Sequence, residues 1–168
     1  MTQIFESSYK FDFLSRPVLK YYKSRPDAIT PIFATNGAAC FDFYACKPDY
    51  FEGLYIELPS GGITLVPTGL KFDIPKGHHI KIYNRSSMPL KKGLILANGV
   101  GVVDEDYVDE VFGMFYNSTK ETQYIKVGDR IMQGELVSNS KNFYFEEIKK
   151  ASEKKGNRTG GLGSTGNA

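Results

Sequence analysis

The chain has 168 residues, which suits one domain with a sizeable hydrophobic core. Its 21 Lys and Arg residues nearly balance its 19 Asp and Glu residues, so the formal charge is +2, and no basic run predicts a groove for polymeric DNA or RNA. Hydrophobic stretches are short and the N-terminus MTQIFESSYK has no apolar signal region. We therefore expect a soluble protein without a membrane span, located in the cytoplasm, or in the host cytoplasm if the source is viral.

Short strands separated by glycine and proline turns dominate the elements that the sequence predicts. Strands are expected at residues 18–23, 41–45, 54–58, 63–66, 70–74, 78–83, 94–97, 100–103, 110–116, 123–127, 135–137 and 143–148. One short helical segment is expected at residues 87–92, where Pro89 limits it to about one turn. Many short, evenly spaced strands predict an all-β fold, either a barrel or a jelly roll.

The cysteines and histidines do not predict a disulfide or a metal site. Cys40 and Cys46 are expected to be free thiols in a reducing compartment. His78 and His79 are adjacent in a predicted strand, where they would point to opposite faces.

The segment GVVDEDYVDEV, residues 101–111, is the most informative part of the chain. An apolar half-strand runs into Asp104, Glu105 and Asp106, Tyr107 follows, and the strand pattern then resumes. We expect a β-hairpin with carboxylates and one aromatic ring crowded at its turn. Taken alone, the cluster also suits a solvated acidic turn, and Tyr107 also suits a core aromatic with a satisfied hydroxyl.

Four further segments complete a pattern. They are ACFDFYA at residues 39–45, NRSSMPLKKG at 84–93, GDRIMQ at 128–133 and GGLGSTG at 160–166. With GVVDEDY in its place among them, the ordered set resembles the five sequence motifs of the trimeric dUTPases (deoxyuridine triphosphatases) and covers most of residues 18–168. The resemblance implies a jelly-roll-like β-barrel of short strands with a mobile C-terminal tail, assembled as a homotrimer whose subunits share active sites.

The same resemblance divides the chain into three parts. Residues 1–16 form an N-terminal extension without a counterpart, residues 17–150 form the β-barrel domain, and residues 151–168 form a flexible, glycine-rich lid. In the family, this lid closes over the nucleotide at another subunit's site and excludes water. A P-loop is disfavoured, because Leu162 stands after Gly161 where that motif requires lysine.

The implied activity is hydrolysis of dUTP to dUMP and pyrophosphate, which limits uracil in DNA and supplies dUMP for dTMP synthesis. Asp104 takes the place of the general base, Ser86 and Gln133 act with it, and Asp42 holds Mg²⁺ through water. The implied substrate-binding residues are Arg85, Ser86, Ser87, Asn98, Val103, Tyr107, Gln133, Arg158, Gly161, Leu162, Gly163, Ser164 and Thr165.

The residue types suit this chemistry. A carboxylate at a turn can orient and deprotonate an attacking water. Asp42, Asp104 and Asp106 would repel a triphosphate, so a divalent ion is expected, and the expected ion is Mg²⁺ held mainly by phosphate oxygens and waters. Arg85 can fork onto phosphate oxygens, although alone it also suits a surface ion pair, and Gln133 alone also suits a strand residue bonded to backbone.

Base and sugar selection are expected at the predicted hairpin. Uracil presents two carbonyl acceptors and one N–H donor, which the N–H and C=O groups of an extended strand edge can match. Asn98 aligns with the family residue that helps to read the uracil edge. Tyr107 packed against C2′ would leave no room for a ribose hydroxyl.

Two alternatives and four departures from the family pattern remain. The related dCTP deaminases share an RSS motif but use a glutamate in the hairpin region and an arginine soon after RSS, which this chain lacks. A dUTPase-like regulatory protein that binds a protein partner is suggested only by residues 1–16. The departures are Cys40 for glycine, Asn84 for proline, Leu162 for phenylalanine, and Asn157 for an arginine that Arg158 follows.

Overall fold

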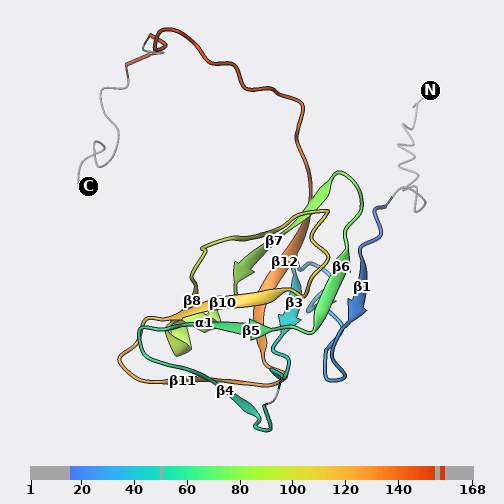
Figure 1. Ribbon diagram of the computed structural model, residues 1–168, viewed down its shortest axis with the longest axis vertical. Coiled ribbons are helices and arrows are strands. Elements are labelled where there is room, and N and C mark those ends of the chain that lie inside the picture. The colour runs from blue at the N-terminus through green and yellow to red at the C-terminus, as the bar shows by residue number, and fades with distance from the viewer. Residues whose placement is uncertain (1–15, 50, 154–155, 158–168) are drawn as a thin grey trace, which may run out of the picture.

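The computed structural model describes residues 16–49, 51–153 and 156–157 (Figure 1). The expected extension therefore lies, apart from Arg16, outside the described residues, as do residues 158–168 of the expected lid. The elements are β1 Lys20–Lys23, β2 Ile32–Phe33, β3 Phe41–Tyr44, β4 Tyr55–Leu58, β5 Ile63–Pro67, β6 Leu70–Asp73, β7 His78–Asn84, α1 Ser87–Lys92, β8 Leu94–Leu96, β9 Gly101–Val103, β10 Phe112–Asn117, β11 Gln123–Lys126 and β12 Arg130–Ser138.

The all-β prediction is confirmed. In the described part of the chain the strands form sheets with the orders β1-β6, β5-β10-β8, β11-β4 and β2-β3-β12-β7-β9. Every strand pair in these sheets is antiparallel. Alternating exposed and buried residues, as in β4, place one face of a strand in the core and the other outside.

The core is built from aromatic and aliphatic side chains of the packed sheets. Phe43 and Phe115 are fully buried, and the rings of Phe41 and Phe43 lie 5.2 Å apart. Gly134 of β12 faces the rings of Phe41 and Phe43, and a Cβ there would lie 2.6 Å from atoms of each. The close approach of β12 to these rings therefore requires glycine at this position.

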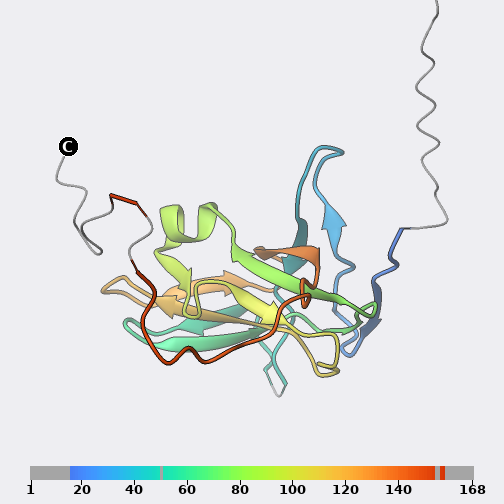
Figure 2. The ribbon, with the colours of Figure 1, turned by 90° about the horizontal axis from the view of Figure 1, so that it is seen from above.

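The predicted helical segment is confirmed as α1, which stands out from one side of the strands in Figure 2. It ends at Gly93, which adopts a left-handed conformation with φ of 61° and donates its N–H to the carbonyl of Pro89. This is the usual way to stop a helix, because glycine adopts positive φ without steric cost.

The predicted β-hairpin at residues 101–111 is wrong. β9 pairs with β7, whereas β10 pairs with β5 and β8, so the two strands belong to different sheets. The intervening residues, 104–111, therefore form a crossing loop between sheets. Local pattern cannot distinguish such a crossing from a hairpin, because both alternate strand, turn and strand.

Three other strand predictions need correction. β2 lies in a segment that was expected to be a loop, and β12 begins at Arg130, five residues before the expected start. Residues 143–148 are not a strand; Phe143, Tyr144, Phe145 and Ile148 are 65%, 82%, 94% and 59% exposed. The segment that contains them runs away from the strand layers in Figure 1, where no neighbouring strand can pair with its backbone.

Cys40 and Cys46 are free thiols, as expected. Burial, followed by a hydrogen bond to Asp27, raises the pKa of the Cys46 thiol to about 12. Among the described residues, no helix is long and apolar enough to cross a membrane.

Candidate active site

A buried carboxylate lies at one end of a row of residues that crosses three strands. Asp42 of β3 is opposite Gln133 of β12, and Gln133 is opposite Tyr83 of β7. Arg85 follows β7 directly, so the chain brings the first, second and fourth motifs together at one end of the five-stranded sheet.

Asp42 is only 1% exposed and is paired with two arginines. Its Oδ2 accepts a hydrogen bond from Arg130 Nη1 at 3.0 Å, and its Oδ1 lies 3.2 Å from Arg85 Nε and 3.5 Å from Gln133 Nε2. Arg85 also donates through Nη1 to the carbonyl of Arg130 at 3.0 Å. These contacts compensate the charge of a carboxylate that would otherwise be costly to bury.

Arg130 was not among the residues selected from the sequence. The register of β12 against β3 shifts between Arg130 and Met132, which marks a β-bulge. Residues three apart face opposite sides of a regular strand, but the extra residue of a bulge allows both Arg130 and Gln133 to reach Asp42. The only sequence signal was the presence of Arg130 within GDRIMQ.

A cationic hollow of about 320 Å³ opens beside this cluster. It is lined by Arg85, Ser87, Met88, Lys91, Lys92, Asp129 and Arg130. Lys92 is held by the carbonyl of Tyr124 at 2.6 Å and lies 3.6 Å from Asp129. Ser86 is exposed at the start of α1, and its side chain makes no capping hydrogen bond with the helix. The lining carries four cations and one acidic residue, and an excess of positive charge remains when the Asp42 carboxylate behind the two arginines is also counted, which favours an anionic ligand in this hollow.

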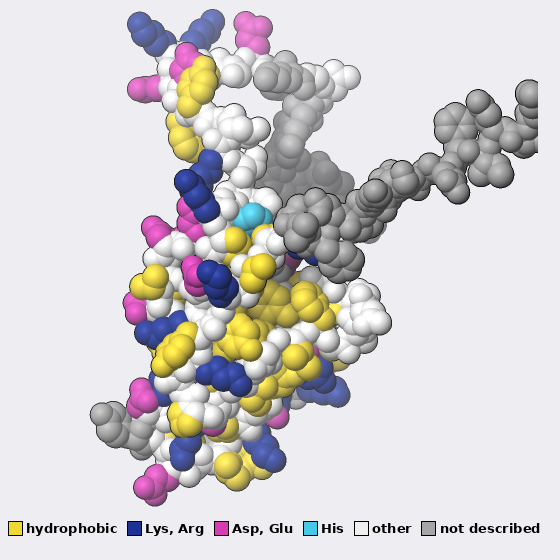
Figure 3. Space-filling view, turned by 90° about the vertical axis from the view of Figure 1, so that its right-hand side faces the viewer, with side chains coloured by type: hydrophobic (Ala, Val, Ile, Leu, Met, Phe, Trp, Pro, Cys, Tyr) yellow, Lys and Arg dark blue, Asp and Glu magenta, His cyan; other side chains and the backbone are white. Residues whose placement is uncertain are grey.

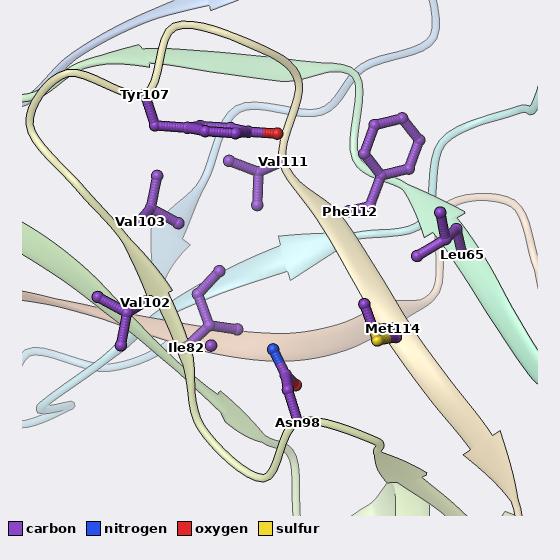
Figure 4. A pocket seen from close by; sticks show the side chains of 10 residues that line it. Leu65, Ile82, Asn98, Val102, Val103, Tyr107, Val111, Phe112 and Met114 are labelled. Carbon is purple, nitrogen blue, oxygen red and sulfur yellow. The ribbon is translucent and has the colours of Figure 1, made fainter.

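A separate apolar pocket of about 300 Å³ lies between β9 and β10. Its lining residues are Leu65, Ile82, Asn98, Gly101, Val102, Val103, Tyr107, Val111, Phe112 and Met114. Figure 4 shows Asn98 directed into the pocket at one end and the flat ring of Tyr107 at the other. The pocket thus contains three of the predicted site residues, namely Asn98, Val103 and Tyr107.

The backbone beside this pocket is partly open. β9 is an edge strand of its sheet, and β8 pairs with β10 only from Phe115 to Asn117. Beyond that ladder the Ala97 N–H donates to the Met114 carbonyl at 2.8 Å, so the part of β10 left open on the side of β8 within the described chain is its start, at Phe112 and Gly113. Unpaired N–H and C=O groups of this kind can bind a planar group that presents complementary donors and acceptors.

Asp104 is exposed and lies in neither of these two sites. It lines a third hollow, of about 360 Å³, together with His79, Val102, Glu105, Asp106, Asn139 and Lys141. The turn that carries it is held by a hydrogen bond from the Tyr107 N–H to the Asp104 carbonyl and by a short one from the Gly77 N–H to the Glu105 carboxylate.

Asp104 and Arg85 lie at opposite ends of β7. Val103 is opposite Ile80, which places Asp104 beside His79, whereas Arg85 follows the last residue of the strand. At about 3.3 Å per residue, six residues correspond to a separation of roughly 20 Å. One copy of the chain therefore does not bring the predicted base and the predicted phosphate ligand together. The predicted tail residues Arg158, Gly161, Leu162, Gly163, Ser164 and Thr165 lie outside the described residues.

A family model described as dUTPase matches residues 27–166. The chain belongs to the dUTPase family. The deoxyuridine 5'-triphosphate nucleotidohydrolase of Lactococcus lactis subsp. lactis is 38% identical over 142 residues, which cover 81% of this chain and 87% of that protein. The corresponding protein of Finegoldia magna is 39% identical over 136 residues, covering 81% of this chain and 90% of that protein.

Solved dUTPases share the jelly-roll-like fold of this family member. The dUTPase from Streptococcus mutans aligns with a TM-score of 0.62 and 28% identity, covering 76% of this chain and 98% of that chain. A point mutant of the dUTPase from phage phi11 of S. aureus, described as coordinating a structural Mg(II) ion, aligns with a TM-score of 0.63 and 17% identity over 81% of this chain and 97% of its own. At that identity the second likeness shows the fold alone.

Proposed function

We propose that this dUTPase family member hydrolyses dUTP to dUMP and pyrophosphate, which keeps uracil out of DNA and supplies dUMP for dTMP synthesis in the cytoplasm. The observation that carries the proposal is the pairing of two different sites on one chain. Arg85 and Arg130, held on buried Asp42, line a cationic hollow, and the apolar pocket between β9 and β10 offers open backbone groups. These are the two chemistries that a nucleoside triphosphate requires.

The apolar pocket is the proposed nucleoside site. Asn98 and the free edges of β9 and β10 would hydrogen-bond the uracil edge, and the thymine methyl would clash in so narrow a slot. Tyr107 at the far end would lie against C2′ of the sugar, while buried Val103 forms part of the wall. The order of these residues along the pocket matches the order of base and sugar in a nucleotide.

The cationic hollow is the proposed triphosphate site. Arg85 offers a planar fork to phosphate oxygens, and Ser86 and Ser87 offer hydroxyl and backbone donors beside it. Gln133 adds an uncharged amide donor from the same row as Asp42. Before the nucleotide binds, Asp42 orients Arg85, because a carboxylate contact fixes the direction of the guanidinium.

Hydrolysis requires one proton acceptor. In the proposed reaction, Asp104 accepts a proton from the attacking water as that water's oxygen bonds to the α-phosphorus, and the bond to the bridging oxygen of pyrophosphate breaks. Arg85 and Gln133 offset the negative charge that develops on the phosphate oxygens. The predicted lid residues Arg158, Gly161, Leu162, Gly163, Ser164 and Thr165 would close over the nucleotide and exclude water.

Mg²⁺ is the proposed cofactor, and the residues present fit it. The described residues contain no cluster of three or more His, Cys, Asp or Glu side chains that would hold a metal by themselves. Mg²⁺ commonly binds phosphates and waters with only one or two protein carboxylates, so no such cluster is needed. When bound, the ion would neutralise phosphate charge and polarise the phosphoryl oxygens. Asp42 retains lone pairs for a metal-bound water, provided that Arg85 moves from it onto the phosphates.

The separation of Asp104 and Arg85 supports the proposed homotrimer with shared active sites. A triphosphate is shorter than the roughly 20 Å between their positions along β7. We therefore propose that Asp104 and Tyr107 of one copy serve the phosphate site of another. The cyclic arrangement of identical copies would then create equivalent sites between each pair of neighbours.

Exposed apolar side chains support this assembly. The sheet β5-β10-β8 exposes Ile63, Leu65, Ile95, Phe112 and Met114 at 61%, 56%, 40%, 39% and 38%. Hydrophobic side chains also gather in the middle of the face shown in Figure 3, which is the side that carries β1 and β6. Contiguous apolar surface of this kind is typical of subunit interfaces rather than of monomers.

The activity is tested by incubating the protein with each of dUTP, dCTP, dTTP, dATP, dGTP and UTP and measuring released pyrophosphate, with Mg²⁺ and with EDTA. The proposal expects pyrophosphate and dUMP to form from dUTP far faster than products form from any of the other nucleotides, with Mg²⁺ present. Ammonia release from dCTP would instead indicate the deaminase alternative, which neither Asp104 nor the names of the relatives favour.

Shared sites are tested with mixed trimers. Asp104→Asn and Arg85→Ala proteins, each inactive alone, are unfolded together in equal amounts and refolded. About a quarter of the sites should then combine an intact Arg85 from one copy with an intact Asp104 from another, and this fraction of parental activity should return. Proteins refolded separately and mixed afterwards are the control. If co-refolded trimers form but remain inactive, each site draws both residues from one copy.

A further inference from the structure

The loop at residues 104–111 carries Tyr107, whose ring is the proposed sugar contact. The position of this ring depends on Glu110, which lies in the same loop and accepts the hydrogen bond of the Tyr107 hydroxyl. The side chain of Tyr107 lines the apolar pocket and is 41% exposed. Its hydroxyl donates to the backbone carbonyl of Glu110 at 2.9 Å. Figure 4 shows the hydroxyl directed toward the segment that carries Val111. Any shift of Glu110 would therefore move the ring or release its hydroxyl.

Glu110 is fixed by a distant part of the chain. It is only 9% exposed, and its two carboxylate oxygens lie 2.9 and 3.0 Å from Arg25 Nε. The Gly69 N–H donates to the same carboxylate at 2.8 Å. The rest of the Arg25 guanidinium is engaged by the Asp49 carboxylate and the Lys47 carbonyl. A charge with so little access to water is stable only because these partners surround it.

The backbone next to Glu110 is held in the same place. The hydroxyl of Thr68 donates to the Val111 carbonyl at 2.6 Å, and the Val111 N–H donates to the Leu70 carbonyl at 2.9 Å. Because the Val111 N–H and the Glu110 carbonyl belong to one planar peptide, the bond to Leu70 also orients the carbonyl that receives the Tyr107 hydroxyl. The Glu110 side chain and its ion pair with Arg25 add a second anchor at the same residue, on the other side of its Cα.

We propose that Arg25 and Glu110 are positioning residues for Tyr107, and that their ion pair sets how strongly the enzyme prefers deoxyribose to ribose. The proposal rests on the proposed hydrolysis of dUTP and on contact between Tyr107 and the sugar. When the loop is held in place, the Tyr107 ring occupies the space beside C2′ and excludes the 2′-hydroxyl of UTP. When the loop is loosened, the ring can move away and leave room for that hydroxyl. Neither Arg25 nor Glu110 touches the substrate or the reacting atoms.

The test measures kcat and KM for dUTP and for UTP in Glu110→Gln, Arg25→Lys and Tyr107→Phe. Glu110→Gln removes the charge but retains an acceptor for Gly69, Arg25→Lys retains a charge but loses the fork, and Tyr107→Phe removes only the hydroxyl. In Glu110→Gln and Arg25→Lys we expect the ratio of kcat/KM for dUTP to that for UTP to fall about tenfold, mainly through a lower KM for UTP, with kcat for dUTP little changed. Tyr107→Phe alters the proposed sugar contact itself, so for this variant only a fall in the ratio is expected.

The matched control is Lys20→Met, which breaks an ion pair of 3.0 Å between two side chains that are each 71% exposed. This variant should retain the parental ratio. A purely structural role for Arg25 and Glu110 would lower activity on both nucleotides in parallel with the folded fraction, and that result, or an unchanged ratio, overturns the proposal. If Glu110→Gln does not fold, the ratios of kcat/KM for dUTP and UTP in Arg25→Lys and Tyr107→Phe test the proposal.

Failure of the proposed function gives a different result. A folded parent that cleaves no dUTP overturns the hydrolysis, and the same variants are then compared for binding of dUMP and UMP by calorimetry. Equal weakening of both nucleotides in the variants would overturn the positioning of Tyr107. A selective improvement for UMP would support it without the reaction.

Discussion

Replacing Asp42 by asparagine tests whether this buried residue stabilises the protein by pairing with arginines. The substitution preserves shape but removes the negative charge, so Arg85 and Arg130 lose their common partner. If the new amide keeps the orientation of the carboxylate, its N–H groups face the N–H donors of a guanidinium, and two donors cannot form a hydrogen bond. We expect lower stability together with lower activity, because Arg85 is no longer held in place.

The magnitude follows from the two contacts. A hydrogen bond to a charged group contributes about 1.5–3 kcal/mol, and breaking a fully buried ion pair costs about 3–5 kcal/mol. The arginine side chains are 23% and 42% exposed, so water partly replaces the lost contacts. We therefore expect a loss of about 2–3 kcal/mol in the free energy of unfolding, which lowers Tm by about 4–12 °C for a chain of this size.

The assay is thermal unfolding by circular dichroism at one fixed protein concentration, in EDTA and in Mg²⁺. Asp73→Asn is the control, because it breaks only the exposed pair with Lys20 and should change stability by less than about 1 kcal/mol. The reasoning fails if Asp42→Asn unfolds at the parental temperature in EDTA. That result would mean that the arginine contacts contribute nothing and would leave water-mediated metal binding as the role of Asp42.

Three further predictions concern other parts of the molecule. Asp104→Asn should retain binding of a non-hydrolysable dUTP analogue but lose about 10²–10⁴-fold in turnover, and near-parental turnover in a single-turnover assay would exclude Asp104 as the base. Gly134→Ala should cost about 1–3 kcal/mol in urea unfolding, because the new methyl group would lie 2.6 Å from atoms of two phenylalanine rings; an unchanged midpoint would mean that β12 can shift freely. At pH 8, iodoacetamide should modify partly exposed Cys40 before Cys46, whose thiol has a pKa of about 12, and modification of Cys46 should accelerate as pH rises; mass spectrometry of tryptic peptides checks the order.

Much of the strand content was predictable because alternation of apolar and polar residues is a local property. β7 and α1 lie close to their expected ranges, and the residues of the first, second and fourth motifs do meet at one end of a sheet. Residues 143–148 show the limit of this reasoning. Their pattern suits a strand, but a strand also requires a partner, and within one copy of the chain they lie away from the sheets.

The amino-acid sequence by itself determined the class of chemistry. An ordered set of motifs gave the family, and carboxylates, arginine and tyrosine in fixed positions gave the proposed base, phosphate ligand and sugar contact. These assignments depend on residue type and local order, which are visible in a linear chain.

Only the tertiary structure decided which of these residues act together. The bulge in β12 brings Arg130 to Asp42, the crossing of residues 104–111 between two sheets opens the nucleoside pocket, and Arg25 reaches Glu110 across 85 positions of sequence. The register of β9 on β7 separates Asp104 from Arg85 within one copy. Contacts of this kind arise from strand register and sheet packing, which depend on long-range burial and therefore leave no local signature in the sequence.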